Sequence, residues 1–343
     1  MSRTFYILAI LLFWTTTITA NNSSLPWIEL NVKPSNTVKS DQQIRLLPEN
    51  KEQTDSDAVP LYEKAVKSFP QDFPSQKFSQ WRKTPPDQLP LQEVQSEFKK
   101  LQPTLDLITQ ATRCKDCNWP DIKPEQAQER YFDDLKTYLN IAYVFIVQAK
   151  IQIYQGQYDQ ALDSVKTDLK IANNLGSAPS LTQSMVGIAI GDRNLNIIEE
   201  LIRSDNSPNL YWALKDLPQP LTDVRKAIKV ETDNLKNYNA LLRSEFEKIL
   251  KPAHDRILKQ MNYIDRKIDA LECIEALRLF AGSHDGKFPD KLSDVTEYDI
   301  PNDPVTKKAF SYTSTGSEAV LELEGTENSD GRDAVRYEIK LKK

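Results

Sequence analysis

Apolar residues recur at steps of three and four through most of the chain, and this spacing predicts a mainly helical protein. The longest such stretch runs from Tyr131 to Leu175. Two neighbouring apolar stripes run along its first part, one with Leu135, Tyr138, Ala142 and Phe145 and the other with Leu139, Tyr143 and Ile146. Two adjacent stripes indicate a helix that is covered on most of its sides. The pattern breaks at Gly156 and then resumes, which predicts a helical hairpin at the centre of the molecule.

The turn of this hairpin resembles the turn of a tetratricopeptide repeat. The resemblance is carried by Tyr154, Gly156, Tyr158, Ala161 and Leu162, where small residues permit close approach and tyrosines fill the groove. It covers one repeat and is incomplete, because Val165 and Asp168 stand where the repeat has an aromatic and a small residue. No second in-phase copy is found. The sequence therefore favours a hairpin within a larger bundle over a solenoid of repeats.

Further helices are expected on both sides of the hairpin. The expected ranges are Ala58 to Phe69, about Leu91 to a point before Cys114 with a kink or a division at Pro103, Leu181 to Ile202, and two long amphipathic helices after Pro220 that Pro252 separates. Ser180 is a suitable N-cap for the helix that starts at Leu181. Gly187 and Gly191 inside that helix predict a close crossing with another helix.

The C-terminal segment changes its pattern to alternation, with β-forming residues such as Tyr312, Val320 and Tyr337. Together with Gly286-Lys287-Phe288-Pro289 and Ile300 to Pro304, it resembles the globular domain of type II secretion pseudopilins. The resemblance implies a helix packed on a small antiparallel sheet, and calcium binding at Glu327, Asp330 and Asp333. The alternative for these carboxylates is a solvated acidic turn. We therefore expect a helical domain over residues 58–271 and a semi-independent α+β domain over 272–343.

The N-terminus has the layout of a secretory signal peptide, with Arg3, an apolar run from Phe5 to Trp14 and small polar residues up to Ala20. The run is about half the length that a membrane-spanning helix needs. We expect cleavage near Ala20 and an exported, periplasmic or envelope-associated protein, and an uncleaved anchor is the alternative. Residues 21–57 are polar and without period, which predicts a flexible linker.

The composition and the motifs exclude several classes of function and indicate none directly. The formal charge is −5 with acids and bases interspersed, which gives no electrostatic case for nucleic acid. Only two histidines are present, and the chain has no nucleophile elbow, phosphate-binding glycine loop or His-Glu-x-x-His motif. We therefore expect a non-catalytic protein without a cofactor.

Cys114 and Cys117 share a short loop with Trp119. In an exported protein, a disulfide between them or a buried Cys117 beside Trp119 is the leading interpretation. A redox pair would lack the βαβ context in which a thiolate is stabilised at a helix start. A zinc site would have to recruit Cys273 and either His254 or His284, and nothing in the spacing suggests it, so no metal is expected.

Several short motifs together resemble an uncharacterised family of exported, helix-rich bacterial proteins. They are Cys117-Asn118-Trp119, Gly156 to Leu162, Leu181 to Gly191, Pro208-Asn209-Leu210-Tyr211-Trp212-Ala213-Leu214 and Asp216-Leu217-Pro218. The similarity covers about Ala58 to Ala227, and Cys114 and Pro120 depart from the usual pattern of the family. The resemblance implies a fold and no activity.

Combining these observations, we expect an exported helical scaffold or binding protein with a protein or peptide partner. Tyr154, Tyr158, Tyr211 and Trp212 form the candidate binding surface, and an aromatic core role is the alternative for Tyr211 and Trp212. Membrane contact is expected only through a retained N-terminus. The alternative functions are an accessory of a secretion or pilus-like envelope machine, and an enzyme.

Overall fold

The structure, a computed structural model, describes residues 27–36, 44–121, 129–326 and 333–342. It is mainly helical with a small four-stranded sheet, which confirms the fold class that the apolar spacing predicts. The helices are α2 (Val59–Ser68), α3 (Ser75–Trp81), α4 (Leu91–Thr112), α5 (Glu129–Tyr154), α6 (Tyr158–Gly176), α7 (Leu181–Arg203), α8 (Tyr211–Lys215), α9 (Arg225–Asn234) and α10 (Ala240–Ser283). The strands are β1 (Trp27–Val32), β2 (Thr54–Asp57), β3 (Cys114–Asp116), β4 (Ser311–Ser314), β5 (Glu318–Leu323) and β6 (Val335–Leu341).

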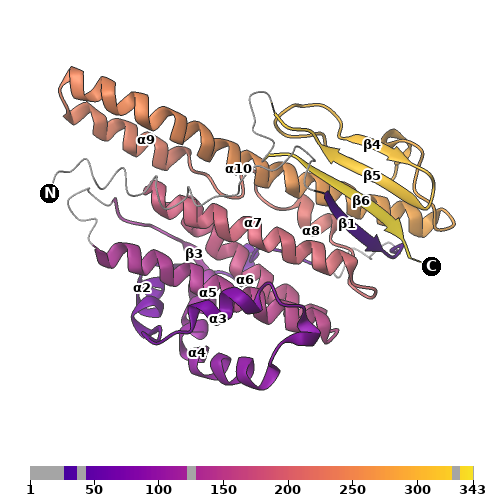
Figure 1. Cartoon of the computed structure of the whole chain (residues 1–343), viewed down its shortest axis with the longest axis horizontal. Helices are drawn as coiled ribbons and strands as arrows, with labels where there is room; N and C mark the ends of the chain where they lie inside the picture. The colour runs from indigo at the N-terminus through magenta and orange to yellow at the C-terminus, as the bar shows by residue number, and fades with distance from the viewer. Residues whose placement is uncertain (1–26, 37–43, 122–128, 327–332, 343) are drawn as a thin grey trace.

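The elements form three tiers, with α2 to α4 on one side, α5 to α7 in the middle, and α10 with the sheet on the other side (Figure 1). The predicted central hairpin is α5 and α6, and the chain turns between them at Gly156, whose φ of 71° suits glycine. The Ser180 side chain accepts a hydrogen bond from Gln183 N and caps α7 as expected. Pro103 lies inside the continuous helix α4, so of the two expected alternatives the division does not occur.

Helices α6 and α7 cross closely where α7 carries glycine. A Cβ atom on Gly187 would collide with the backbone of Gly176 and Ala172 on α6, so only glycine permits this crossing. At Gly191 a Cβ atom would meet neighbouring side chains at 3.5 Å or more, which is ordinary contact. The predicted close approach is therefore confirmed at Gly187 and is not required at Gly191.

The expected linker over residues 21–57 is wrong in part, because Trp27–Val32 is a strand of the C-terminal sheet. The strand order is β1-β6-β5-β4, with β1 parallel to β6 and the other pairs antiparallel. Leu30 and Val32 are fully buried and join the apolar core. A six-residue strand with two inward side chains is too short a signal to stand out in a polar segment. The expected signal peptide lies outside the described residues.

The second correction concerns α10, which runs without a break from Ala240 to Ser283 through both Pro252 and the expected boundary at residues 271 and 272. Pro252 is exposed, so water can satisfy the carbonyl that loses its helical partner there. Every residue from Ile264 to Ala281 is buried. One apolar cluster extends from α6 and α7 across this buried half of α10 to β5 and β6. The helical body and the sheet thus share one core.

Charged side chains on the buried half of α10 connect it to its neighbours. Arg266 donates from Nε to Asp303 Oδ2 at 2.7 Å and from Nη1 to the carbonyl of Asp333 at 2.6 Å. Lys267 Nζ lies 2.9 Å from Glu199 Oε1 on α7, and the Tyr337 hydroxyl donates to that same oxygen. Buried charges are tolerated only when they are paired and hydrogen-bonded, so these bonds align α10 with α7 and the sheet.

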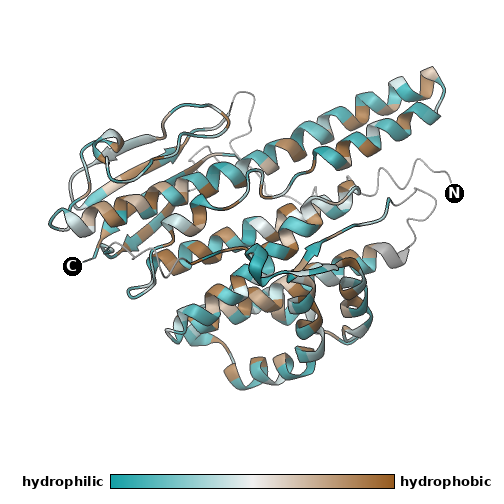
Figure 2. Cartoon of the chain, turned by 180° about the vertical axis from the view of Figure 1, so that it is seen from behind, coloured by the Kyte–Doolittle hydropathy of each residue, from teal (hydrophilic) through white to brown (hydrophobic). Residues whose placement is uncertain are grey.

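The first half of α10 and α9 form an arm that projects beyond the body (Figure 1). Hydrophobic side chains are exposed on it at Tyr238, Leu241, Leu242 and Ile249, and Figure 2 shows apolar positions near its end. Among the described residues, no helix combines the length and the apolar character that crossing a membrane requires.

Candidate functional site

The structure does not combine the four predicted aromatic residues into one surface. Tyr154 and Trp212 are exposed, by 57% and 42%, and Tyr158 is half-buried against the core. Tyr211 is fully buried, and its hydroxyl donates to the carbonyl of Asp299 at 2.9 Å. The prediction that Tyr211 lines a binding surface is therefore wrong, and its role as a core aromatic with a satisfied polar end is the correct one. Adjacent side chains on a helix point about 100° apart, and Trp212 next to Tyr211 is exposed.

Cys114 and Cys117 are free cysteines in this structure. The Cys114 thiol accepts a hydrogen bond from Ser56 Oγ at 3.2 Å, and Cys117 packs against the same apolar cluster as Trp119. Burial, together with the nearby Asp57 carboxylate, raises the pKa of the Cys117 thiol to about 12, so the reactive thiolate is disfavoured. Cys273 belongs to the other cluster, with α10. The three cysteines are thus not gathered into one site.

Metal binding has no assembled site in the described part of the chain, where no group of three or more His, Cys, Asp or Glu side chains is placed to hold an ion. Of the acidic turn, Glu327 and Asp330 lie outside the described residues. Asp333 is buried, accepts a hydrogen bond from Thr326 N at 3.0 Å and lies 3.7 Å from Arg266 Nη1. Asp333 therefore helps to bind Arg266.

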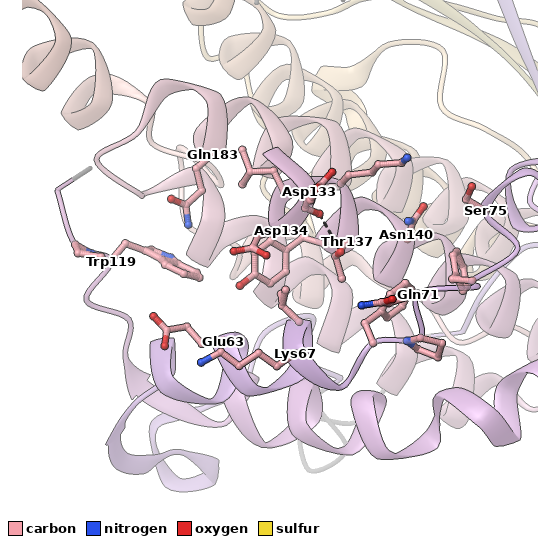
Figure 3. Close-up of a pocket in the computed structure, with 18 residues that line it drawn as sticks. Glu63, Lys67, Gln71, Ser75, Trp119, Asp133, Asp134, Thr137, Asn140 and Gln183 are labelled. Carbon is pink, nitrogen blue, oxygen red and sulfur yellow. Dashed lines mark hydrogen bonds between the residues drawn. The ribbon is translucent and has the colours of Figure 1, made fainter. Parts of the chain in front are cut away.

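A cleft with a volume of about 890 Å³ lies between α2 and the start of α5. Figure 3 shows α2 and the following loop on one side of the cleft, α5 on the other and Trp119 at one end. Its apolar lining comes from Val66, Phe69, Phe73, Trp119, Leu135 and Tyr138. We call this hollow the α2–α5 cleft. Its volume lies in the range of roughly 300–1,000 Å³ typical of ligand pockets.

Trp119 is held rigidly at the end of the α2–α5 cleft. Its ring stacks on Tyr62 with centroids 5.5 Å apart and meets Tyr138 edge-on at 6.1 Å. Its indole Nε1 donates to the carbonyl of Asn174 at 2.9 Å. The preceding loop is fixed as well, because Asn118 N donates to Asp57 Oδ1 at 3.1 Å. A preorganised aromatic wall costs no ordering entropy when a ligand binds.

The rim of the cleft carries charges of both signs. Glu63 and Lys67 project from α2, and Asp133 and Lys136 come from α5 (Figure 3). None of these four side chains forms an ion pair with another described residue. Their charges are therefore available to a ligand. Because the rim is exposed, ion pairs between these side chains and a ligand would contribute more to the orientation of the ligand than to its affinity.

Two buried amides point to a ligand more directly. Asn140 on α5 is 9% exposed, Gln183 on α7 is 2% exposed, and both line the α2–α5 cleft (Figure 3). Neither side chain makes a hydrogen bond to another described residue, although Gln183 N donates to Ser180. The fully buried polar atoms without a partner among the described residues do not include theirs, so these two amides open into the cleft. A ligand with its own donors and acceptors would satisfy them.

The sequence alone does not identify these two amides as site residues. Asn140 interrupts an apolar stretch between Leu139 and Ile141, which is a detectable signal, but many such residues lie at helix surfaces. Gln183 sits in the first turn of α7, where polar residues are common. Only the packing of α5 against α7 brings both amides to one cleft.

A second hollow, of about 510 Å³, lies between α4, α5 and α6. Its lining includes Phe145, Gln148 and Arg113. Lys166 and Glu52, which also line it, form an ion pair at 2.6 Å. This pair neutralises two of its charged groups internally, whereas Gln148 Oε1 is buried and has no hydrogen-bond partner among the described residues.

Comparison with known proteins found no matching family model, no matching curated protein and no matching solved structure.

Proposed function

We propose that this protein is an exported, non-catalytic binding protein whose α2–α5 cleft holds an extended segment of a partner polypeptide. The observation that carries the proposal is the pair of amides at Asn140 and Gln183, which line the cleft and bond to no described residue through their side chains. A carboxamide both donates and accepts hydrogen bonds, as does each peptide unit of an extended chain. Two such groups in one cleft suit a backbone better than they suit a purely anionic or purely apolar ligand.

The remaining lining supports the same class of ligand. Trp119 and Tyr138 give apolar and aromatic surface for one side chain of the bound segment, and both are fixed by their mutual packing. Rim charges of both signs, such as Asp133 and Lys136, would select segments with complementary charges at their ends. Export rests on the layout of Met1 to Ala20.

The test is a selection of peptides on the protein without its first 20 residues, followed by affinity measurements on single variants. Asn140→Ala and Gln183→Ala should each weaken the selected peptide about fivefold to a hundredfold, because each removes a buried hydrogen bond of about 1–3 kcal/mol. Their melting temperatures should hardly change, since neither side chain has a protein partner to lose. Gln80→Ala, at an exposed position outside the cleft, is the matched control.

Hydrogen exchange gives the second readout. Bound peptide should slow amide exchange in residues 63–75 and 133–140, on the two sides of the cleft. Selection of no peptide, or protection confined to another face such as the arm, would refute the proposal. Equal affinity of the wild type and both alanine variants would refute it as well.

A further inference from the structure

A second polar feature lies apart from the α2–α5 cleft, on the seam between α5 and α7. Tyr143 and Lys150 are seven residues apart on α5, and Arg193 and Glu200 are seven apart on α7. A spacing of seven returns to the same helix face two turns on, so the seam has two levels. Lys150 Nζ lies 3.9 Å from Glu200 Oε1 at one level, and Tyr143 meets Arg193 at the other.

The end of α3 closes over this seam. Lys150 Nζ donates to the carbonyls of Arg82 at 2.9 Å and Thr84 at 3.1 Å, which satisfies carbonyls at the C-terminal end of the helix. Lys150 is almost fully buried, so this connection is firm. It places the Arg82 side chain over the Tyr143 ring, with the guanidinium carbon 4.9 Å from the ring centroid.

Two guanidinium groups therefore share one aromatic ring, because the guanidinium carbon of Arg193 lies 5.3 Å from the same centroid. The ring attracts both, but a quadrupole does not neutralise a charge. Neither Arg82 nor Arg193 forms an ion pair with a described carboxylate. Among the described residues, the one side-chain hydrogen bond of the two runs from Arg193 Nη1 to the carbonyl of Ala189 at 2.7 Å.

The Arg82 guanidinium is also incompletely satisfied. Its Nε atom is buried and has no hydrogen-bond partner among the described residues. Burial is the main cause that holds the pKa of Arg82 below its usual value. Tyr143 opposes this shift, and the positive charge of Arg193 adds to it. A buried, unpaired donor on a charged group is rare and calls for a missing water or ion. Here the neighbouring like charge favours an anion over water.

We propose that Arg82 and Arg193 form a binding site for a divalent oxyanion of the phosphate type. Two fixed positive charges match two negative ones, and each planar guanidinium can donate two parallel hydrogen bonds to such an oxyanion. Both side chains are half-buried, so an ion can reach them from solvent while part of its surroundings is protein. Tyr143 is not among the residues that line the α2–α5 cleft, so this site is separate from the one proposed for a peptide.

Inorganic phosphate is the probe, and the readouts are calorimetry and the melting temperature of the protein without its first 20 residues. Phosphate should raise the melting temperature in a saturable way, whereas sodium chloride at equal ionic strength should not. Arg82→Gln and Arg193→Gln should each weaken phosphate binding at least about tenfold, because each removes charge-assisted hydrogen bonds. Tyr143→Phe should bind normally, since it keeps the ring.

Lys83→Gln is the matched control, because it removes an exposed positive charge beside Arg82 and should leave binding unchanged. Arg82→Lys keeps the charge without the planar fork and should bind with intermediate affinity, which separates recognition from simple charge. Equal effects of phosphate and chloride would overturn the proposal. A second result would also overturn it. If both glutamine variants raised the melting temperature without phosphate, and phosphate had no effect on the wild type, the two arginines would merely repel each other.

Discussion

Phe145 on α5 shows how a single residue contributes to the middle tier. It is 5% exposed and belongs to the apolar cluster that α5 shares with α2 and α4. The helical spacing of apolar residues predicts this position from the sequence, because Phe145 continues the stripe of Tyr138 and Ala142. Its neighbours on the other helices are beyond what that spacing can predict.

Phe145→Ala should lower the free energy of unfolding by about 3–5 kcal/mol, because it removes buried apolar surface and leaves a cavity. Urea denaturation followed by circular dichroism measures the loss. Phe246→Ala on the projecting arm, where the ring is half-exposed, is the control and should cost much less. A loss below about 1 kcal/mol for Phe145→Ala would mean that the site is an open groove and not core.

At the scale of the element, α10 carries three buried carboxyl groups on one face. Asp265, Asp269 and Glu272 are spaced by four and three residues, which aligns them along the helix. Burial raises their pKa values to about 6, about 7 and about 8, and repulsion from Asp269 adds to the shift at Glu272. Leu221 N donates to Asp265 Oδ1 at 3.0 Å and Gln219 donates to Asp269. Glu272 makes no such bond to a described residue.

The shift at Glu272 predicts a dependence of stability on pH. A carboxyl group whose pKa is raised by folding stabilises the protein below its unfolded pKa, near 4.5, and this contribution is lost as the pH rises through about 8. The wild type should therefore lose stability across this window. Lys215 and Asp299 also face Glu272. They have opposite charges and bond to each other, so they do not reverse the upward direction of the pKa shift at Glu272.

Glu272→Gln should raise the melting temperature at pH 9 and have little effect at pH 4.5, because it removes the ionisation that burial opposes. Thermal melts by circular dichroism across this pH range provide the measurement. Glu318→Gln, at an exposed position on β5, is the matched control and should leave the pH profile unchanged. Parallel profiles for Glu272→Gln and the wild type would show that Glu272 ionises without cost in the folded protein.

At the scale of the whole molecule, the sheet and the helical body depend on each other. The change of pattern in the sequence predicts a semi-independent domain over residues 272–343, but one apolar cluster joins α7 and α10 to β5 and β6. On α10, Arg266 bonds to Asp303 in the C-terminal segment, and Lys267 pairs with Glu199 on α7. Removal of the sheet would expose buried apolar surface on α10 and leave Arg266 without Asp303, and both effects destabilise.

A chain that ends at residue 282 should therefore be unfolded, or melt far below the full chain, by circular dichroism and limited proteolysis. The control keeps all residues but carries a protease site in the loop at Gly286, where φ is 67° and the backbone is exposed. The nicked protein should stay folded, because the core remains complete. Cooperative unfolding of the shortened chain at the temperature of the full chain would show that the body folds alone.

Local patterns in the sequence determine most helices, the Gly156 turn, the Ser180 cap and the alternation in the C-terminal strands. These features depend on interactions between residues within four positions of each other, and such interactions are present in the sequence itself. Of the candidate cleft, Leu135 and Tyr138 are identified from the sequence as members of an apolar stripe, and Trp119 as an aromatic residue beside two cysteines.

Tertiary structure alone decides the rest, because the partners are far apart in the chain. Strand β1 is positioned by pairing with β6, about three hundred residues away in the chain. In the buried half of α10, Asp303 pairs with Arg266 and Glu199 pairs with Lys267, which makes the burial of these charges possible. The same holds for both proposed sites. Asn140 and Gln183 line one cleft, and Arg82 and Arg193 lie over one tyrosine ring, only through the packing of helices. The energy of such long-range contacts leaves no local pattern in the sequence.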